Sequence, residues 1–150
     1  MPSGGCWCDG TRYEYNVKPL DRILCHCVTC QKISGGAFTV NLMVPTKEVH
    51  MTQGAENLKS HTQPHILGGK LSVYFCGICG TCLYKQLHMS PFDQNFVIQS
   101  GTLDEVEGKL GADVEPPDQE SFIECRASWL PALELIDMRK DTTRNVVAKD

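Results

Sequence analysis

Cysteine spacing constrains this chain more than any other feature of its sequence. Eight of the nine cysteines fall in three short clusters: Cys6 and Cys8; Cys25, Cys27 and Cys30; Cys76, Cys79 and Cys82. C-x-C and C-x-x-C pairs are half-sites for a metal ion, because their two thiolates can converge on one point. One pair of each kind would close a tetrahedral shell, whereas three thiolates leave a coordination position free.

We therefore expect two zinc ions per chain in sites of different character. The expected closed, structural site is made by Cys6, Cys8, Cys76 and Cys79. The expected open site is made by Cys25, Cys27 and Cys30, and an open position is what chemistry at the metal requires. The simpler alternative for the first pair is that Cys6 and Cys8 lie in a frayed terminus and bind nothing.

The redox alternative is a disulfide framework, and the sequence disfavours it. The cysteine count is odd, and the first residues carry neither a charged segment nor an apolar segment of the kind found in export signals. We expect a reducing, cytoplasmic location, where thiols persist and bind metal. Nucleic acid and membrane partners are not expected. The net charge is −4, no run of Lys or Arg occurs, and no apolar stretch approaches the roughly 18 residues of a membrane span.

The segments between the clusters predict a mainly β fold. Short runs rich in β-branched and aromatic residues are separated by Gly and Pro breaks, and they lie at residues 11–15, 22–24, 37–44, 71–75, 96–98 and 122–123. Only residues 30–34 and 131–135 suggest a turn or two of helix. We expect one zinc-binding domain of folded antiparallel sheets over residues 1–138, with metal sites at its turns, followed by a polar tail at residues 139–150.

The remaining candidate residues have less specific signals. His26 lies between two expected ligands and is a candidate for catalytic proton transfer, although a supporting or surface histidine is the simpler interpretation. His50, His61 and His65 fall in a connecting stretch that could fold over the open site, and the simpler interpretation is solvated loop residues. Cys82 could be a spare ligand, but a small apolar strand residue is the preferred interpretation.

Two late residues are expected to be structural. Cys125 is isolated from the clusters and is expected to pack in the core or on a strand. Trp129 is expected to anchor the core, because a large apolar ring is usually buried.

Five ordered sequence blocks between residues 4 and 133 carry a resemblance to a known family. They are Gly5-Cys6-Trp7-Cys8 with Arg12-Tyr13, Cys25-His26-Cys27-Val28-Thr29-Cys30-Gln31-Lys32, Gly36-Ala37-Phe38, Phe75-Cys76-Gly77-Ile78-Cys79-Gly80-Thr81, and Trp129-Leu130-Pro131. Together they resemble the glutathione-dependent formaldehyde-activating enzyme family, also called the centromere protein V family. Asp9 departs from the pattern, because the family commonly has glycine there.

The resemblance implies an Mss4-like β fold with two zinc sites. The positions matching structural zinc are Cys6, Cys8, Cys76 and Cys79, and those matching a more open, catalytic zinc are Cys25, Cys27 and Cys30. The family's activity is a carbon–sulfur lyase reaction that interconverts S-hydroxymethylglutathione with formaldehyde and glutathione. It implies a small-molecule substrate, such as a glutathione adduct or another thiol adduct.

Two functional classes follow from the sequence. The favoured hypothesis is a zinc-dependent lyase acting on a thiol–carbonyl adduct or a related polarised carbon centre. The alternative is a non-catalytic zinc module that binds a protein partner, since a fold alone does not decide function. The middle cluster discriminates between them, because a scaffold gains little from three further thiols that leave a coordination position free.

Overall fold

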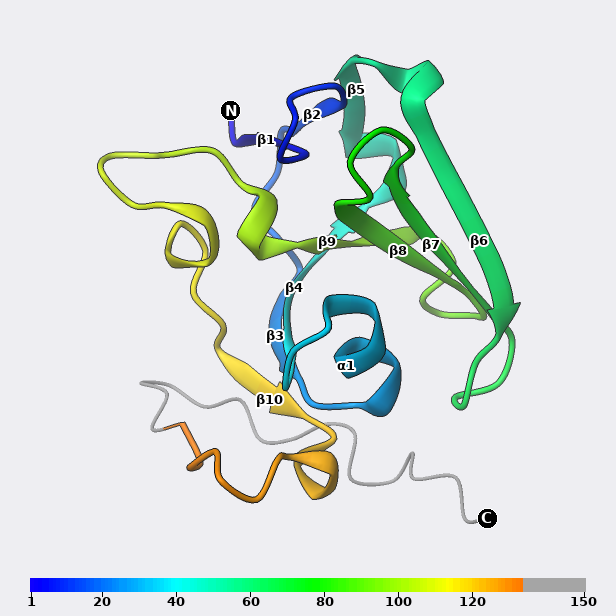
Figure 1. Cartoon of the computed structure of the whole chain (residues 1–150), viewed down its shortest axis with the longest axis vertical. Helices are drawn as coiled ribbons and strands as arrows, with labels where there is room; N and C mark the ends of the chain where they lie inside the picture. Colours follow the sequence, from blue (N-terminus) through cyan, green and yellow to red (C-terminus); the bar gives the residue numbers. More distant parts are fainter. Residues whose placement is uncertain (134–150) are drawn as a thin grey trace.

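Short β-strands are the main regular structure of the molecule, whose computed structural model describes residues 1–133 (Figure 1). The strands are β1 Ser3–Gly5, β2 Arg12–Tyr15, β3 Asp21–Cys25, β4 Thr39–Pro45, β5 Val49–Gln53, β6 Leu58–Pro64, β7 Lys70–Cys76, β8 Cys82–His88, β9 Asn95–Gln99 and β10 Gln119–Ser121. One α-helix, α1, spans Val28–Ser34. Short 3₁₀ helices span Thr46–Glu48, Ala55–Asn57, Ser100–Thr102, Gly111–Asp113 and Ile123–Cys125. The expectation of a mainly β fold is confirmed.

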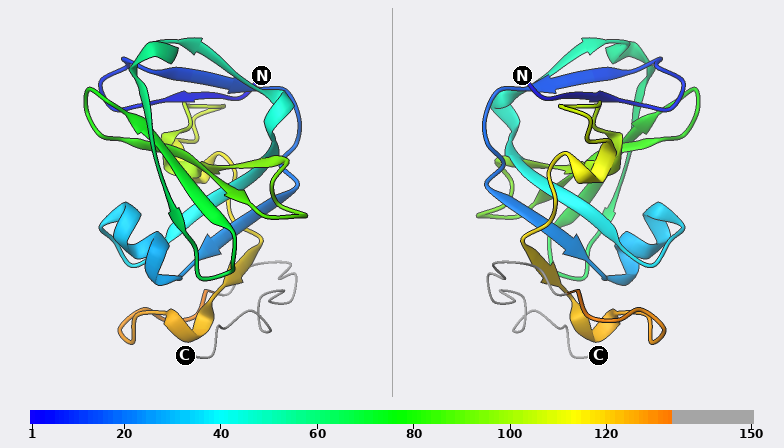
Figure 2. Two further views of the ribbon diagram at one scale, coloured as in Figure 1. Left: turned by 90° about the vertical axis from the view of Figure 1, so that its right-hand side faces the viewer. Right: turned by 90° about the vertical axis from the view of Figure 1, so that its left-hand side faces the viewer.

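The strands form two sheets (Figures 1 and 2). The smaller has the order β1-β2-β5, and the larger has the order β10-β3-β4-β9-β8-β7-β6. All pairs are antiparallel except β10 with β3, which is parallel. The larger sheet therefore brings residues from both halves of the chain onto the same surface.

The register of the larger sheet assigns its side chains to two faces. Leu42 lies opposite Ile98, which lies opposite Tyr84, and all three are buried in the main hydrophobic core. One position along, Met43 lies opposite Val97, which lies opposite Lys85. Because side chains alternate along a strand, this second row lies on the other face of the sheet. The sheet thus covers a core on one face and carries a lysine on the other.

Helix α1 lies beside β3 and β4 and follows directly from the cluster that begins at Cys25 (Figure 1). Cys27 is the N-cap residue, and its side chain accepts a hydrogen bond from the backbone N–H of Cys30. Gly35 ends the helix in the left-handed conformation, with φ of 66°, where glycine has no steric penalty. The short helix therefore fixes the spacing of the middle cysteines.

Five of the expected strands are confirmed to within two residues, as β2, β3, β4, β7 and β9. The expected strand at residues 122–123 is wrong. The neighbouring strand, β10, ends at Ser121, and Phe122 adopts a left-handed conformation with φ of 55° that turns the chain into a 3₁₀ helix. The expected helix at residues 30–34 is confirmed within α1. Residues 131–133 are irregular, and the rest of the helix expected at 131–135 lies outside the described residues.

Two other expectations need correction. The stretch carrying His50 and His61 is a pair of strands, β5 and β6, rather than a solvated loop, although both histidines are exposed. Trp129 is 74% exposed and does not anchor the core, because it follows the last regular element of the described chain.

The C-terminal end of the expected domain is only partly described by the structure. The polar tail at residues 139–150 and the last residues of the expected domain lie outside the described residues. Within residues 1–133, the structure contains no helix of the length and apolarity needed to cross a bilayer.

Candidate metal centres and active-site cavity

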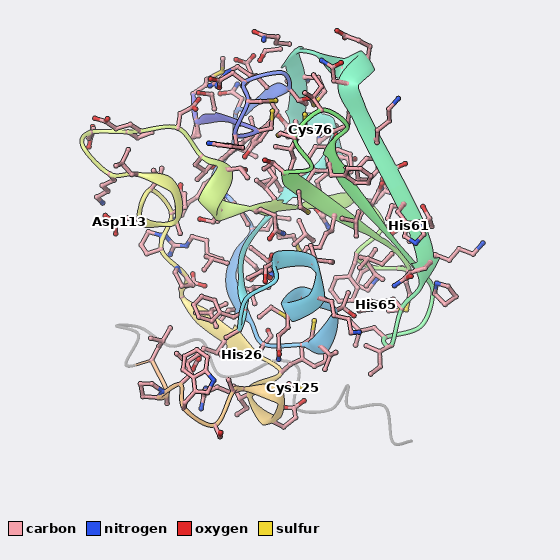
Figure 3. The ribbon with its side chains drawn as sticks, in the orientation of Figure 1. His26, His61, His65, Cys76, Asp113 and Cys125 are labelled. Atoms are coloured by element: carbon pink, nitrogen blue, oxygen red, sulfur yellow. The ribbon has the colours of Figure 1, made fainter. Side chains whose placement is uncertain are left out.

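Four cysteines from opposite parts of the chain meet at one end of the molecule, near Cys76 in Figure 3. This four-cysteine set comprises Cys6, Cys8, Cys76 and Cys79, and its sulfur atoms all lie within 4.8 Å of one another. The Sγ atoms of Cys6 and Cys8 are 3.5 Å apart, and those of Cys8 and Cys76 are 3.8 Å apart. The set ties the turn after β1 to the turn between β7 and β8.

Both turns of the four-cysteine set close through a residue with positive φ. Asp9 has φ of 55°, and its N–H donates to the carbonyl of Cys6. Gly80 has φ of 78°, and its N–H donates to the carbonyl of Cys76. Aspartate tolerates this conformation better than most residues, so the departure from glycine at position 9 preserves the turn.

Hydrogen bonds favour a thiolate in the four-cysteine set. The Thr81 hydroxyl lies 3.2 Å from Cys79 Sγ. This contact and a hydrogen bond from the Thr81 backbone lower the pKa of Cys79 to about 5. A turn that stabilises thiolate before any ion arrives is suited to metal binding.

The middle cluster forms a second set at the N-terminus of α1. This three-cysteine set comprises Cys25, Cys27 and Cys30, and its sulfur atoms lie within 4.8 Å of one another. All three residues are buried. Cys25 ends β3, and Cys27 caps the helix that carries Cys30. Within residues 1–133, no fourth His, Cys, Asp or Glu joins this set.

A buried lysine lies against the three-cysteine set, and the sequence analysis did not identify it. Lys85 is 4% exposed, its Nζ lies 3.4 Å from Cys30 Sγ, and it donates to Asn41 Oδ1 at 3.0 Å. Hydrogen bonds from the Cys25 and Cys27 thiols, with a further contribution from the Lys85 ammonium, hold the pKa of Cys30 below its ordinary value. The available signal was a lysine between the apolar residues Tyr84 and Leu87 of β8, but the sequence did not show which face of the sheet would be covered.

The three-cysteine set opens onto a cavity of about 160 Å³ between α1 and the larger sheet. The cavity walls are mainly aliphatic and aromatic, and the residues that line it are Ile23, Cys25, Cys27, Thr29, Cys30, Asn41, Met43, His65, Leu67, Leu71, Lys85, Leu87, Phe92, Val97, Ser121 and Phe122. Thiols at the end of an apolar cavity with few polar groups are typical of a small-molecule site.

His26 does not line this cavity. Its side chain is 1% exposed, and its Nε2 lies 2.9 Å from Glu120 Oε1. Arg126 binds the other oxygen of Glu120 at 2.9 Å. The ring also packs edge-on to Phe38, near β10 as Figure 3 shows. The structure therefore places His26 in a buried polar network that holds the backbone between Cys25 and Cys27.

Removing the centre of that network is expected to destabilise the fold. Glu120→Ala leaves the Arg126 guanidinium and the His26 ring without their buried acceptor. We expect the free energy of unfolding to fall by about 3–5 kcal/mol, the usual cost of breaking a buried pair from one side. Denaturant titration measures this change. Glu105→Ala, at an exposed position, is the control and should change stability by less than about 0.5 kcal/mol. If Glu120→Ala lowered the free energy of unfolding no more than Glu105→Ala does, the network would contribute nothing to stability.

The other candidate residues are separated by the fold. His65 lines the cavity, and its Nδ1 accepts the N–H of Leu67 at 3.3 Å. Burial lowers the pKa of His65, so its ring favours the neutral form. His50 and His61 do not line this cavity. Cys82 lines a different hollow, and burial raises its pKa to about 11. Cys125 packs beside the three-cysteine set but belongs to neither set.

Zinc fits both sets on donor chemistry, because each set brings its cysteine sulfur atoms within 4.8 Å of one another. Zn–S bonds of about 2.3 Å in a tetrahedron place sulfur atoms about 3.8 Å apart. The two sulfur–sulfur distances of 3.5 and 3.8 Å in the four-cysteine set agree with that geometry. All nine cysteines are free, so no disulfide competes for the sulfur atoms.

Comparison with known proteins identifies the family to which the chain belongs. A family model described as glutathione-dependent formaldehyde-activating enzyme matches residues 1–124. The chain belongs to this family. The glutathione-dependent formaldehyde-activating family is by its description an enzyme family, broadly of lyases, and its members act on small thiol adducts. The matched residues contain both cysteine sets, Lys85 and the whole cavity wall.

A solved structure supports the fold. A crystal structure of a Rhodobacter sphaeroides protein matches with a TM-score of 0.56 and 18% identity, and the match covers 72% of this chain and 96% of that one. At that identity the likeness concerns the fold alone. No curated protein matches the sequence.

Proposed function

We propose that this protein is a zinc-dependent carbon–sulfur lyase that acts on a small thiol–carbonyl adduct. In this proposal the four-cysteine set holds a structural zinc ion and the three-cysteine set holds a catalytic one. The observation that carries the proposal is the position of three buried thiols at a cavity whose wall also contains a buried ammonium. Nine free thiols fit a reducing compartment such as the cytoplasm.

The three-cysteine set supplies the chemistry through its metal. Zinc bound there would act as a Lewis acid toward an oxygen or a thiolate in its remaining position. Three thiolates around a dication carry one net negative charge, and the Lys85 ammonium, 3.4 Å from Cys30 Sγ, offsets it. This neutralisation makes the centre a better acceptor of an anionic oxygen or sulfur than the thiolates alone would allow.

Lys85 is also placed to act on the substrate. Asn41 holds its ammonium through a hydrogen bond of 3.0 Å, and Gln99 donates to the same amide oxygen at 3.1 Å. A fixed ammonium in an apolar cavity stabilises the negative charge that develops on oxygen or sulfur as the C–S bond breaks. We therefore assign Lys85 to electrostatic stabilisation of the reacting atoms.

The reaction moves one proton between two atoms of the substrate. In the cleavage direction the hydroxyl oxygen of the adduct loses its proton, the carbonyl forms, and the C–S electron pair leaves with sulfur. The sulfur then takes up a proton, so the balance requires no oxidant or reductant. His65 is the titratable ring in the cavity wall, and we assign the proton transfer to it. His26 is assigned to positioning the cysteines, because Glu120 holds it away from the cavity.

The alternative function, a non-catalytic zinc module, explains less of the geometry. A structural module requires the four-cysteine set, but it has no use for thiols and a buried ammonium at a small cavity. Charge buried beside thiols is costly to stability and is most easily understood as serving a reaction.

Replacing Lys85 by methionine tests the catalytic proposal. Lys85→Met keeps the approximate volume of the side chain and removes its charge, and Asn41 Oδ1 still accepts a hydrogen bond from Gln99. We expect kcat/KM for cleavage of S-hydroxymethyl thiol adducts to fall about 10²- to 10³-fold, as when one donor to a developing anion is removed. Release of formaldehyde by the purified, zinc-loaded protein is the measurement.

The matched control is Lys47→Met, whose side chain is 81% exposed. It should leave kcat/KM unchanged, and the zinc content of both variants should equal that of the wild type. Wild-type turnover in Lys85→Met with its zinc content intact would exclude Lys85 from the reaction. No turnover of any thiol adduct by the zinc-loaded wild type would contradict the proposed function.

A further inference from the structure

The cavity at the three-cysteine set has a wall chemistry that restricts what can enter it. Its floor is the face of the larger sheet on which Met43, Val97 and Lys85 lie opposite one another. Leu71 and Leu87, which also pair across the sheet, extend this floor. Apart from the Lys85 ammonium and the Asn41 amide that it contacts, the floor is therefore an apolar surface made by four neighbouring strands.

The cover over this floor is also largely apolar. Leu67 from the turn between β6 and β7, Phe92 from the segment after β8, and Phe122 from the turn after β10 line the cavity. These contributions come from segments far apart in the sequence. Besides the three cysteines, the polar residues that line the cavity are Thr29, Asn41, His65, Lys85 and Ser121. A ligand in this space exchanges water for hydrocarbon over most of its surface.

The size of the cavity sets a second limit. At about 160 Å³ it matches the volume of an apolar cavity that accommodates one benzene molecule. Glutathione is a tripeptide that carries two carboxylates and one ammonium, and it is several times larger than benzene. Only the thiol end of such a molecule could occupy this space.

The charges of the cavity give the third limit. Among the described residues that line it, Lys85 and His65 are the groups that can carry positive charge, and no arginine contributes. The Lys85 ammonium already contacts Cys30 and Asn41, and burial lowers the pKa of His65. Because Lys85 is committed to the cysteine thiols and to the reacting atoms of the proposed reaction, no further fixed cation lines the described cavity wall for two substrate carboxylates. An unpaired carboxylate buried here would be strongly unfavourable.

We propose that the cavity selects thiol adducts whose non-reacting part is small, uncharged and apolar, about the size of a benzene ring. This inference rests on the proposed lyase function and departs from the substrate in the family's name. It assigns selectivity to the apolar floor, with Val97 at its centre between Met43 and Lys85.

A neighbouring hollow defines the competing outcome. It has a volume of about 510 Å³ and shares Cys27, Leu71 and Phe122 with the cavity wall, and Lys32 and His61 line it. If the peptide part of glutathione occupied this hollow while its thiol entered the cavity, glutathione would bind as tightly as an apolar thiol.

Three thiols separate these outcomes by calorimetric titration of the zinc-loaded protein. Benzenethiol is small and apolar, 2-mercaptoethanesulfonate is small and charged, and glutathione is large and charged. Because benzenethiol is a stronger acid than the two alkanethiols, each Kd is expressed for the thiolate form, and the remaining differences in Kd report the rest of the molecule. We expect benzenethiol to bind at least about tenfold more tightly than either charged thiol. Equal or tighter binding of glutathione or of 2-mercaptoethanesulfonate would overturn the inference.

A variant that fills the floor adds a second readout. Val97→Phe should weaken benzenethiol binding at least about tenfold while retaining both zinc ions, because its ring occupies the cavity. Val106→Phe, at a position 39% exposed on a loop outside the cavity, is the matched control and should bind as the wild type does. Unchanged binding by Val97→Phe would show that thiols do not enter this cavity, which also overturns the inference.

Turnover of the hydroxymethyl adducts distinguishes this inference from the proposed function. Faster cleavage of the glutathione adduct than of the benzenethiol adduct would support the lyase and overturn the selectivity. Tight benzenethiol binding without cleavage of any adduct would support the selectivity and contradict the lyase.

Discussion

Cys79→Ser is expected to unfold the protein. Cys79 belongs to the four-cysteine set, which joins the turn after β1 to the turn between β7 and β8. Binding of structural zinc contributes on the order of 10 kcal/mol to folding, whereas a whole domain is stable by only about 5–15 kcal/mol. Losing one of four ligands therefore removes a contribution comparable with the total stability.

Circular dichroism and elemental analysis measure this effect. The wild type should contain two zinc ions per chain and melt cooperatively, whereas Cys79→Ser should show no cooperative transition. Cys82→Ser is the control, because Cys82 lies three residues further along the chain and outside both cysteine sets. It should retain two zinc ions and a cooperative transition. A folded Cys79→Ser variant with native melting would show that the four-cysteine set is not structural.

Cys27→Ser is expected to abolish lyase turnover while leaving the protein folded. Cys27 is both a member of the three-cysteine set and the N-cap of α1, where it accepts the N–H of Cys30 at 3.3 Å. Serine is a favourable N-cap residue, so its hydroxyl can replace that hydrogen bond. The substitution thus removes a proposed metal ligand and keeps the helix start.

The expected loss of turnover in Cys27→Ser is set by how much a zinc ion at this set would stabilise the transition state. Lewis-acid stabilisation of several kcal/mol corresponds to about a 10³-fold fall in kcat/KM or more. Zinc content should fall from two ions to one per chain, with the melting temperature close to that of the wild type. Cys125→Ser is the control, because Cys125 packs beside the same set without belonging to it. If Cys27→Ser lowered the melting temperature as much as Cys79→Ser, both sets would be structural.

The cysteine sets were predicted from the sequence because the relevant geometry is local. Cys25, Cys27 and Cys30 lie within six consecutive residues, and the C-x-C and C-x-x-C pairs each lie within one turn. The strands were predicted for the same reason, since alternation and β propensity act over a few residues. The pairing of Cys6 and Cys8 with Cys76 and Cys79 followed from counting ligands, and the structure brings these sulfur atoms together.

Long-range packing decided which residues surround the three-cysteine set. Lys85 is 55 residues from Cys30 in the sequence, and the two meet because the face of the larger sheet that carries Lys85 lies against α1. A lysine on a strand ordinarily predicts a solvent-exposed face, and alternation alone does not show that both faces of this sheet are covered.

Long-range packing also decided where His26, His65 and Trp129 lie. His26 was singled out because it lies between two expected ligands, but Glu120, from a strand parallel to β3, determines where its ring lies. His65 reaches the cavity wall through the turn between β6 and β7, and Trp129 stays exposed because no later described element covers it. The sequence by itself therefore determined which atoms can bind metal, because ligand spacing is a property of short segments. Only the tertiary structure decided which charge and which apolar walls surround the candidate metal position, because these come from strands that are distant in sequence and adjacent in space.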